Sequence, residues 1–113
     1  MIVRRLVHGM GYRYRLHVGK LPGRPDLVFP SRLKAIFVNG CFWHGHRGCK
    51  RSKKPVENEE FWNRKIERNM MRDRKAKARL RRLGWKVLVV WECRVKESDA
   101  LKETLTRFLL DTT

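Results

Sequence analysis

The run Trp85–Trp91 constrains the fold of this chain more than any other segment. It reads Trp-Lys-Val-Leu-Val-Val-Trp, so Lys86 is its one polar residue. A short run without polar alternation is typical of a strand that is covered on both faces. We therefore predict that it is the central strand of a sheet, with helices packed against that sheet.

Weaker patterns predict three more strands. Residues 12–17 alternate in polarity, which is typical of a half-buried strand. The apolar runs at 26–29 and 34–38 flank a tight turn and predict an antiparallel hairpin that is buried on both faces. In the strand predicted over residues 12–17, we expect Tyr12, Tyr14 and Leu16 on one face and Arg13, Arg15 and His17 on the other.

Apolar residues at helical spacing predict three helices. The first ten residues have the pattern of the end of a helix. Asn58 as N-cap and Gly84 after the last turn bound a long helix, and Ser98 is the expected N-cap of a final one. The chain is thus expected to form a single α+β domain over residues 1–113, in which helices flank a mixed sheet.

The charge balance indicates the kind of partner. The chain has 28 Lys+Arg against 11 Asp+Glu and a net charge of +17, which argues against small-molecule metabolism and favours a polyanion. Its hydrophobic fraction of 42% is too high for a disordered basic tail. No apolar run approaches the ~20 residues of a membrane span, and residues 1–5 are not followed by a signal-like apolar stretch. We expect a soluble, nucleic-acid-binding protein of the cytoplasm, associated with the nucleoid.

The long helix carries much of this charge. Lys and Arg recur from Arg64 to Arg82, and Glu67 and Asp73 are the only acids among them. The acids are too few to pair with all of these cations. One side of this helix is therefore expected to face phosphates.

Residues 39–55 show no periodicity and are expected to form an irregular segment, in which Cys41, His44, His46 and Cys49 gather. Zinc prefers four thiolate or imidazole ligands in a tetrahedron. Cys41-x4-His46-x2-Cys49 supplies three of them, and Cys93 can supply the fourth. The alternative is that Cys93 is an ordinary buried residue and the histidines lie on the surface. We assign His46 to the metal and His44 to other chemistry, although spacing alone does not separate the two.

Asp26 is the candidate for a second kind of metal site. It is the only acid before Glu57, and it opens a strand directly after Pro25. Nucleases use such a carboxylate to hold Mg²⁺. Turn chemistry is the alternative for a Pro-Asp pair. The surrounding positive charge and His44, as a general base, favour the catalytic interpretation.

Several blocks of sequence occur together in one order along the chain. The blocks are Leu-Pro-Gly-Arg-Pro-Asp ending at Asp26, Ile-Phe-Val-Asn-Gly-Cys-Phe-Trp-His-Gly-His ending at His46, Glu-Phe-Trp-Asn-Arg-Lys-Ile from Glu60, Arg68-Asn69, Arg72-Asp73-Arg74, and Leu-Gly-Trp-Lys-Val-Leu-Val-Val-Trp-Glu-Cys ending at Cys93. In these blocks the chain resembles the very-short-patch-repair (Vsr) endonucleases of the PD-(D/E)xK nuclease superfamily. The resemblance implies a restriction-endonuclease-like three-layer core with a structural zinc loop.

The resemblance also implies an activity. Vsr endonucleases nick one DNA strand 5′ to the thymine of a T:G mismatch, with Mg²⁺, to start very-short-patch repair of deaminated 5-methylcytosine. A monomer that can contact other mismatch-repair proteins is implied as well. Two alternatives stay open: a zinc-containing DNA-binding module, and a restriction or defence nuclease of the same superfamily with a different target.

Site residues follow from the resemblance position by position. Asp26 matches the Mg²⁺-binding aspartate, the backbone carbonyl of Val38 faces the same ion, and His44 matches the general base. The implied zinc ligands are Cys41, His46, Cys49 and Cys93. The aromatic side chains implied to wedge into the base stack are Phe42, Trp43 and Trp62, and such a wedge unstacks a mismatched step most easily.

The chain departs from the family pattern at three points. An acid on the family's first helix would fall just before Met1, so we expect that this helix is truncated and that catalysis is weakened. Asn39 stands where some members have a histidine and others an acid. One additional residue lies between His46 and Cys49.

Overall fold

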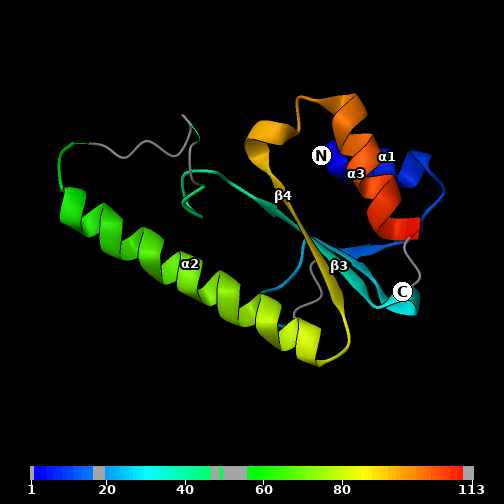
Figure 1. Ribbon diagram of the computed structural model, residues 1–113, viewed down its shortest axis with the longest axis horizontal. Helices are drawn as coiled ribbons and strands as arrows, with labels where there is room; N and C mark the ends of the chain where they lie inside the picture. The colour runs from blue at the N-terminus through cyan, green and yellow to red at the C-terminus, as the bar shows by residue number, and fades with distance from the viewer. Residues whose placement is uncertain (1, 17–19, 47–48, 50–55, 111–113) are drawn as a thin grey trace.

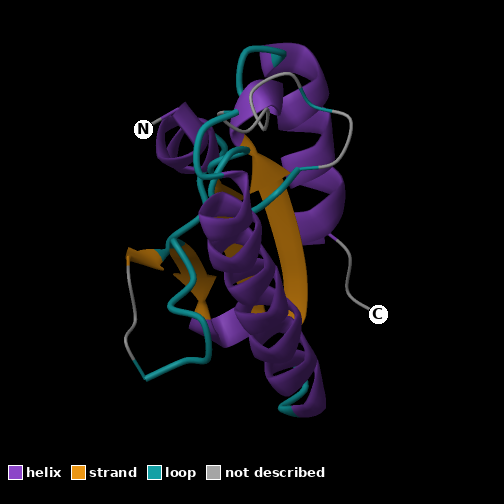
Figure 2. Cartoon of the chain, turned by 90° about the vertical axis from the view of Figure 1, so that its left-hand side faces the viewer, coloured by secondary structure: helices purple, strands orange, loops and turns teal. Residues whose placement is uncertain are grey.

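The computed structural model describes residues 2–16, 20–46, 49 and 56–110. In these residues a four-stranded sheet lies between α2 on one face and α1 and α3 on the other, which makes three layers (Figures 1 and 2). The predicted order of elements is confirmed. The elements are α1 (Ile2–Gly9), β1 (Arg15–Leu16), β2 (Leu27–Phe29), β3 (Lys34–Asn39), α2 (Glu59–Arg82), β4 (Lys86–Trp91) and α3 (Ser98–Leu110), with short 3₁₀ turns at Pro30–Arg32 and Glu92–Arg94.

The sheet is mixed and has the order β1-β2-β3-β4. The first two pairs are antiparallel, and β3 runs parallel to β4 with Ile36 opposite Leu88. The prediction that Trp85–Trp91 forms the central strand is wrong, because β4 is an edge strand in the described sheet and only Val90 of it is buried. Its apolar residues reflect the helical layers that cover its two faces (Figure 1), and they do not report how many strands pair with it.

The predicted hairpin of β2 and β3 is confirmed and forms the centre of the core. All three residues of β2 are buried, and β3 is mostly buried. Their side chains on one face pack against the buried residues of α1 and α3, which pins both helices to the sheet. This core consists of Val3, Val7, Leu27, Phe29, Ile36, Val90, Leu101, Leu105 and Leu109.

The strand predicted over residues 12–17 is confirmed only in part. Only Arg15 and Leu16 pair with β2, and Leu16 is exposed where the alternation predicted it to be buried. The residues before them are still hydrogen-bonded to the end of α1, because the Tyr12 N–H donates to the Val7 carbonyl at 3.3 Å. Tyr12 and Tyr14 nevertheless pack against the core. His17 lies outside the described residues, as do residues 47–48 and 50–55 of the predicted irregular segment.

Helix α2 is confirmed with both of its predicted ends. Asn58 is the N-cap, but it makes no side-chain cap hydrogen bond and has left-handed backbone angles. At the other end, two hydrogen bonds close a Schellman motif, from Gly84 N–H to the Arg81 carbonyl and from Trp85 N–H to the Leu80 carbonyl. Among the described helices, none is long and apolar enough to cross a membrane.

A buried cation that the sequence pattern did not reveal joins β3 to α3. Lys34 is 3% exposed, and its Nζ donates to the carbonyls of Phe108 at 2.5 Å and Leu109 at 3.0 Å. Arg32 donates to the same Leu109 carbonyl at 3.3 Å. Cations at this end of a helix satisfy its last carbonyls and complement its dipole.

Replacing this cation tests its contribution to stability. Lys34→Met removes the buried cation from both carbonyls, and only the Arg32 hydrogen bond to the Leu109 carbonyl remains, so we expect the free energy of unfolding to fall by about 2 kcal/mol. Urea titration followed by circular dichroism measures it. The control Lys102→Met removes an exposed lysine of α3 and should change the value by less than ~0.5 kcal/mol. Equal stabilities of the two variants would contradict the assignment.

Candidate functional site

The segment after β3 winds through a series of turns that fix its side chains. The N–H of His44 donates to the Gly40 carbonyl at 3.2 Å, and the N–H of His46 donates to the Cys41 carbonyl at 3.0 Å. Gly45, with a φ of +61°, lies so close to α2 that a Cβ would be 2.8 Å from side-chain atoms of Ile66 and Met70. A side chain at this position would collide with α2, so glycine lets the segment pack against the helix between His44 and His46.

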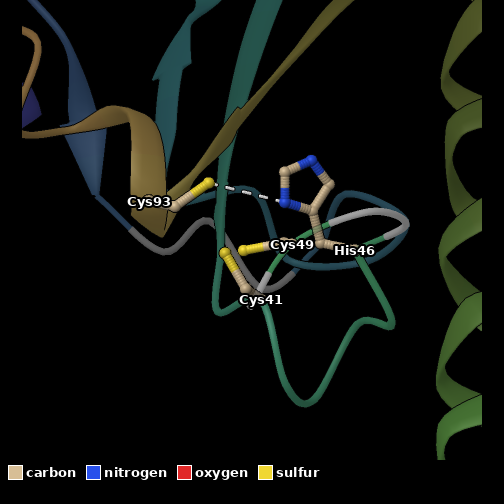
Figure 3. A group of neighbouring side chains, drawn as sticks. All are labelled: Cys41, His46, Cys49 and Cys93. Atoms are coloured by element: carbon tan, nitrogen blue, oxygen red, sulfur yellow. Dashed lines mark hydrogen bonds between the residues drawn. The ribbon is translucent and has the colours of Figure 1, made fainter. Parts of the chain in front are cut away.

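Three sulfur atoms and one imidazole nitrogen converge beside the end of β4 (Figure 3). The donor atoms of Cys41, His46, Cys49 and Cys93 all lie within 4.8 Å of one another, and Cys93 Sγ is 3.5 Å from His46 Nδ1. Sulfur ligands of a tetrahedral zinc lie about 3.8 Å apart, given Zn–S bonds of about 2.3 Å. The soft donors and their spacing fit zinc, so this cluster can hold a metal ion. It contains His46 and not His44.

The surroundings of this cluster act on two of its donors, Cys41 and His46. Burial, with smaller contributions from the neighbouring cysteines, raises the pKa of Cys41 to about 11. Metal binding must therefore displace a proton from this thiol, and a higher pH favours it. The imidazole of His46 stacks on the Trp91 ring with centroids 4.2 Å apart and planes 8° apart. The end of β4 thus supplies Trp91 as a platform for His46, and the 3₁₀ turn that follows it supplies Cys93 as a donor.

His44 is paired with a carboxylate that sequence reasoning did not select. Its Nδ1 lies 2.5 Å from Oδ2 of Asp73 on α2, and both side chains are about 30% exposed, at 29% and 28%. An ionised carboxylate only accepts hydrogen bonds, so Nδ1 donates and Nε2 is the nitrogen that can take up a proton. Asp73 stands seven residues from both Ile66 and Leu80 on the buried face of α2. An acid in line with apolar residues was the signal that could have identified it.

Asp26 lies directly before β2 and is fixed to the neighbouring strand. Its Oδ2 accepts a hydrogen bond from the Val38 N–H at 2.6 Å. The side chain is half-buried. The structure therefore brings the predicted carboxylate next to Val38, whose backbone carbonyl is a second hard oxygen donor.

The three predicted wedge residues form one aromatic cluster. The ring centroid of Phe42 is 5.1 Å from that of Trp43 and 5.4 Å from that of Trp62. Trp43 is 47% exposed. Phe61 also belongs to the cluster, 5.1 Å from Trp62, and was missed because it lies outside the apolar stripe of α2. Lys65 Nζ lies over the ring of Trp43 at 5.0 Å from its centroid, so the cluster presents both apolar surface and positive charge.

Two hollows flank the His44–Asp73 pair. One, of about 370 Å³, includes Arg74 and Lys77 in its lining. The other, of about 400 Å³, includes Arg24 and Arg72. In each hollow, two cations therefore share the lining with His44 and Asp73. This arrangement suits an extended anion such as a nucleic-acid backbone.

Comparison with known proteins aligns nearly the whole chain with three relatives. A family model described as DNA mismatch endonuclease Vsr matches residues 1–51. The Type II nicking enzyme V.XorIIP of Xanthomonas oryzae pv. oryzae is 49% identical over 107 residues, which are 95% of this chain and 78% of that protein. The DNA mismatch endonuclease Vsr of Escherichia coli K12 is 45% identical over 105 residues, which are 92% of this chain and 67% of that protein. The Type II nicking enzyme V.NmeAIP of Neisseria meningitidis is 38% identical over 109 residues, which are 96% of this chain and 77% of that protein.

Proposed function

The chain belongs to the DNA mismatch endonuclease Vsr family and is a DNA endonuclease, and we propose that it nicks one strand 5′ to the thymine of a T:G mismatch in a Mg²⁺-dependent reaction. The observation that carries this proposal is the adjacency of an exposed aromatic cluster and a histidine–carboxylate pair, since Trp43 and His44 are consecutive residues. A wedge enters most easily where base pairing is already weak. Hydrolysis by a neighbouring group would then be confined to the mismatch.

We propose that Asp26 and the backbone carbonyl of Val38 hold Mg²⁺. The donors fit this ion, because Mg²⁺ prefers hard oxygen ligands and is bound by few protein groups. The Val38 N–H fixes one oxygen of the carboxylate at 2.6 Å, which leaves the other oxygen of Asp26 for a ligand. When bound, Mg²⁺ supplies positive charge at the scissile phosphate.

His44 acts as the general base in this proposal. Asp73 accepts a hydrogen bond from the Nδ1–H of His44, so Nε2 is the nitrogen that takes a proton from the attacking water. Because the side chain of Asp73 fixes the imidazole plane, Nε2 is presented in one direction. Phe42, Trp43 and Trp62 are the proposed wedge. Since one copy of the chain carries all of these groups, we propose that it acts as a monomer and a single domain with a restriction-endonuclease-like core.

The Cys/His cluster is proposed as a structural zinc site. It would join the segment from Cys41 to Cys49 to the end of β4, where Cys93 lies. That segment also carries His44, so the metal would fix the orientation of the base. Four protein ligands would leave no open position for catalysis by this ion.

Asp73→Asn tests the proposed role of this carboxylate. The amide retains the shape of the side chain but no longer fixes the tautomer of His44, so we expect kcat/KM for nicking to fall about 10²- to 10³-fold. Single-turnover nicking of a T:G duplex measures this loss. The control Glu67→Gln removes an exposed acid of the same helix and should nick at the wild-type rate. An Asp73→Asn variant as active as this control would refute the pairing.

Matched duplexes test the proposed function itself. The protein is incubated with Mg²⁺ and labelled duplexes that carry T:G or C:G at one position. Nicking confined to the thymine strand of the T:G duplex is the expected result. Equal cutting of both duplexes would favour a nuclease with another target. Binding without nicking would favour a DNA-binding module.

A further inference from the structure

The hollow between α2 and residues 21–24 has a lining suited to a phosphate. It has a volume of about 400 Å³ and is lined by Gly23, Arg24, His44, Asn69, Arg72 and Asp73. The one acid in this lining, Asp73, already accepts a hydrogen bond from His44. In the part of the chain that the structure describes, neither arginine forms an ion pair with a carboxylate. Two guanidinium groups therefore border a hollow whose only carboxylate has another partner.

Arg24 is held in an uncommon backbone conformation. Its φ is +48°, a left-handed value that residues with a Cβ rarely adopt. It also precedes Pro25, which further disfavours compact conformations of the residue before it. A glycine would adopt the same angles more easily. Residues in such conformations cluster at sites where the side chain has a function.

Close packing holds this strained residue in place. Gly23, with a φ of +75°, lies so near α2 that a Cβ would be 2.7 Å from the Cβ of Ala76 and 3.1 Å from the Phe37 ring. The Arg24 N–H donates to the Leu21 carbonyl at 3.2 Å. The backbone from which the Arg24 side chain extends is thus anchored to α2 and β3 at once.

The second arginine is linked to the aromatic cluster. Arg72 Nη2 donates to Oδ1 of Asn69 at 3.2 Å, and Nδ2 of Asn69 donates to the Trp43 carbonyl at 2.8 Å. Arg72 is therefore tied to the backbone immediately before His44. A ligand that contacts Arg72 lies beside both the proposed wedge and the proposed base.

We propose that Arg24 and Arg72 form a phosphate clamp that binds a backbone phosphodiester of the nicked strand beside His44. This inference rests on the proposed function, because it assumes that His44 acts on that strand. The guanidinium group is planar and donates pairs of parallel hydrogen bonds to phosphate oxygens. Phosphate contacts set the register of a protein on the duplex. The clamp would thus set which phosphodiester reaches His44, while the wedge locates the mismatch.

Duplexes in which one phosphodiester carries no charge provide a direct test of the clamp. Binding of short duplexes is measured by fluorescence anisotropy without Mg²⁺, so that no nicking occurs. In each duplex, one phosphodiester near the expected nick is replaced by a methylphosphonate. We expect one such position to weaken wild-type binding about 10-fold, as expected for loss of one charged contact. Arg24→Gln should weaken binding of the unmodified duplex by a similar factor and lower the salt slope by about 1.

The decisive experiment measures how each variant binds the methylphosphonate duplexes. For Arg24→Gln and for Arg72→Gln, the methylphosphonate at that one position should cost less than 2-fold, because the contact is already lost. Arg82→Gln is the matched control, since it removes an exposed arginine from the last turn of α2, and it should keep the full 10-fold loss. Independent, multiplicative effects of Arg24→Gln and the methylphosphonate at every position would overturn the clamp.

A second variant separates binding from folding. Arg24→Gly permits the φ of +48° without a side chain, so Tm should stay the same or rise while the phosphate contact is lost. A lower Tm with unchanged DNA binding would overturn the proposal. The test uses both T:G and C:G duplexes, and the clamp should act on both. If wild-type protein nicks the two duplexes alike, the mismatch proposal fails while the clamp result stands.

Discussion

Asp26→Asn is expected to abolish nicking while the fold remains intact. The amide oxygen of asparagine can still accept the hydrogen bond that the Val38 N–H donates at 2.6 Å. The negative charge needed to hold Mg²⁺ is lost, however, and a catalytic metal contributes several kcal/mol to transition-state stabilisation. At about 1.4 kcal/mol for each factor of ten, kcat should fall by at least ~10³-fold.

Single-turnover nicking of a T:G duplex at saturating protein measures this loss. Asp99→Asn, in the first turn of α3, is the control for removing an acid that is not part of the proposed site, and it should retain wild-type activity. Thermal unfolding should give Asp26→Asn and wild-type protein similar Tm values. A variant that is folded and retains more than a tenth of the activity would exclude Asp26 as the metal-binding carboxylate.

Loss of the proposed zinc is expected to have the largest effect on stability. Cys41 is fully buried, and Cys41→Ser replaces a thiolate donor with a poor ligand. Binding of structural zinc contributes roughly 10 kcal/mol or more to small folds, so we expect Tm to fall by at least ~15 °C. Metal analysis of the purified protein should give one zinc per wild-type chain and none for the variant.

The two histidines provide the matched pair for this prediction. His46→Gln removes a donor that lies 3.5 Å from Cys93 Sγ, so zinc should be lost. His44→Gln removes the neighbouring imidazole, which pairs with Asp73, and one zinc per chain should remain. A wild-type protein that is folded and free of zinc would refute the site.

Local patterns in the sequence were sufficient for much of the fold. The hairpin of β2 and β3 and the ends of α2 were predicted correctly, because periodicity and cap residues act over a few neighbouring positions. The donors Cys41, His46 and Cys49 likewise lie within a few positions of one another in the sequence. Because these positions are close in sequence, the donors predicted from Cys41 to Cys49 are the ones that the structure brings together. The edge position of β4 was not predictable in this way, since the number of neighbouring strands does not alter which residues are apolar.

By itself, the sequence determined the class of the fold, the positive charge and which side chains can bind metals. The tertiary structure alone decided which of them meet. Asp73 reaches His44 across 29 positions of the chain, and Lys34 reaches the end of α3 across 75. Arg24 faces the same hollow as Arg72 only because Gly23 lets its loop pack against α2. Such contacts depend on how helices and strands pack against one another, and this packing cannot be predicted from the spacing of neighbouring residues.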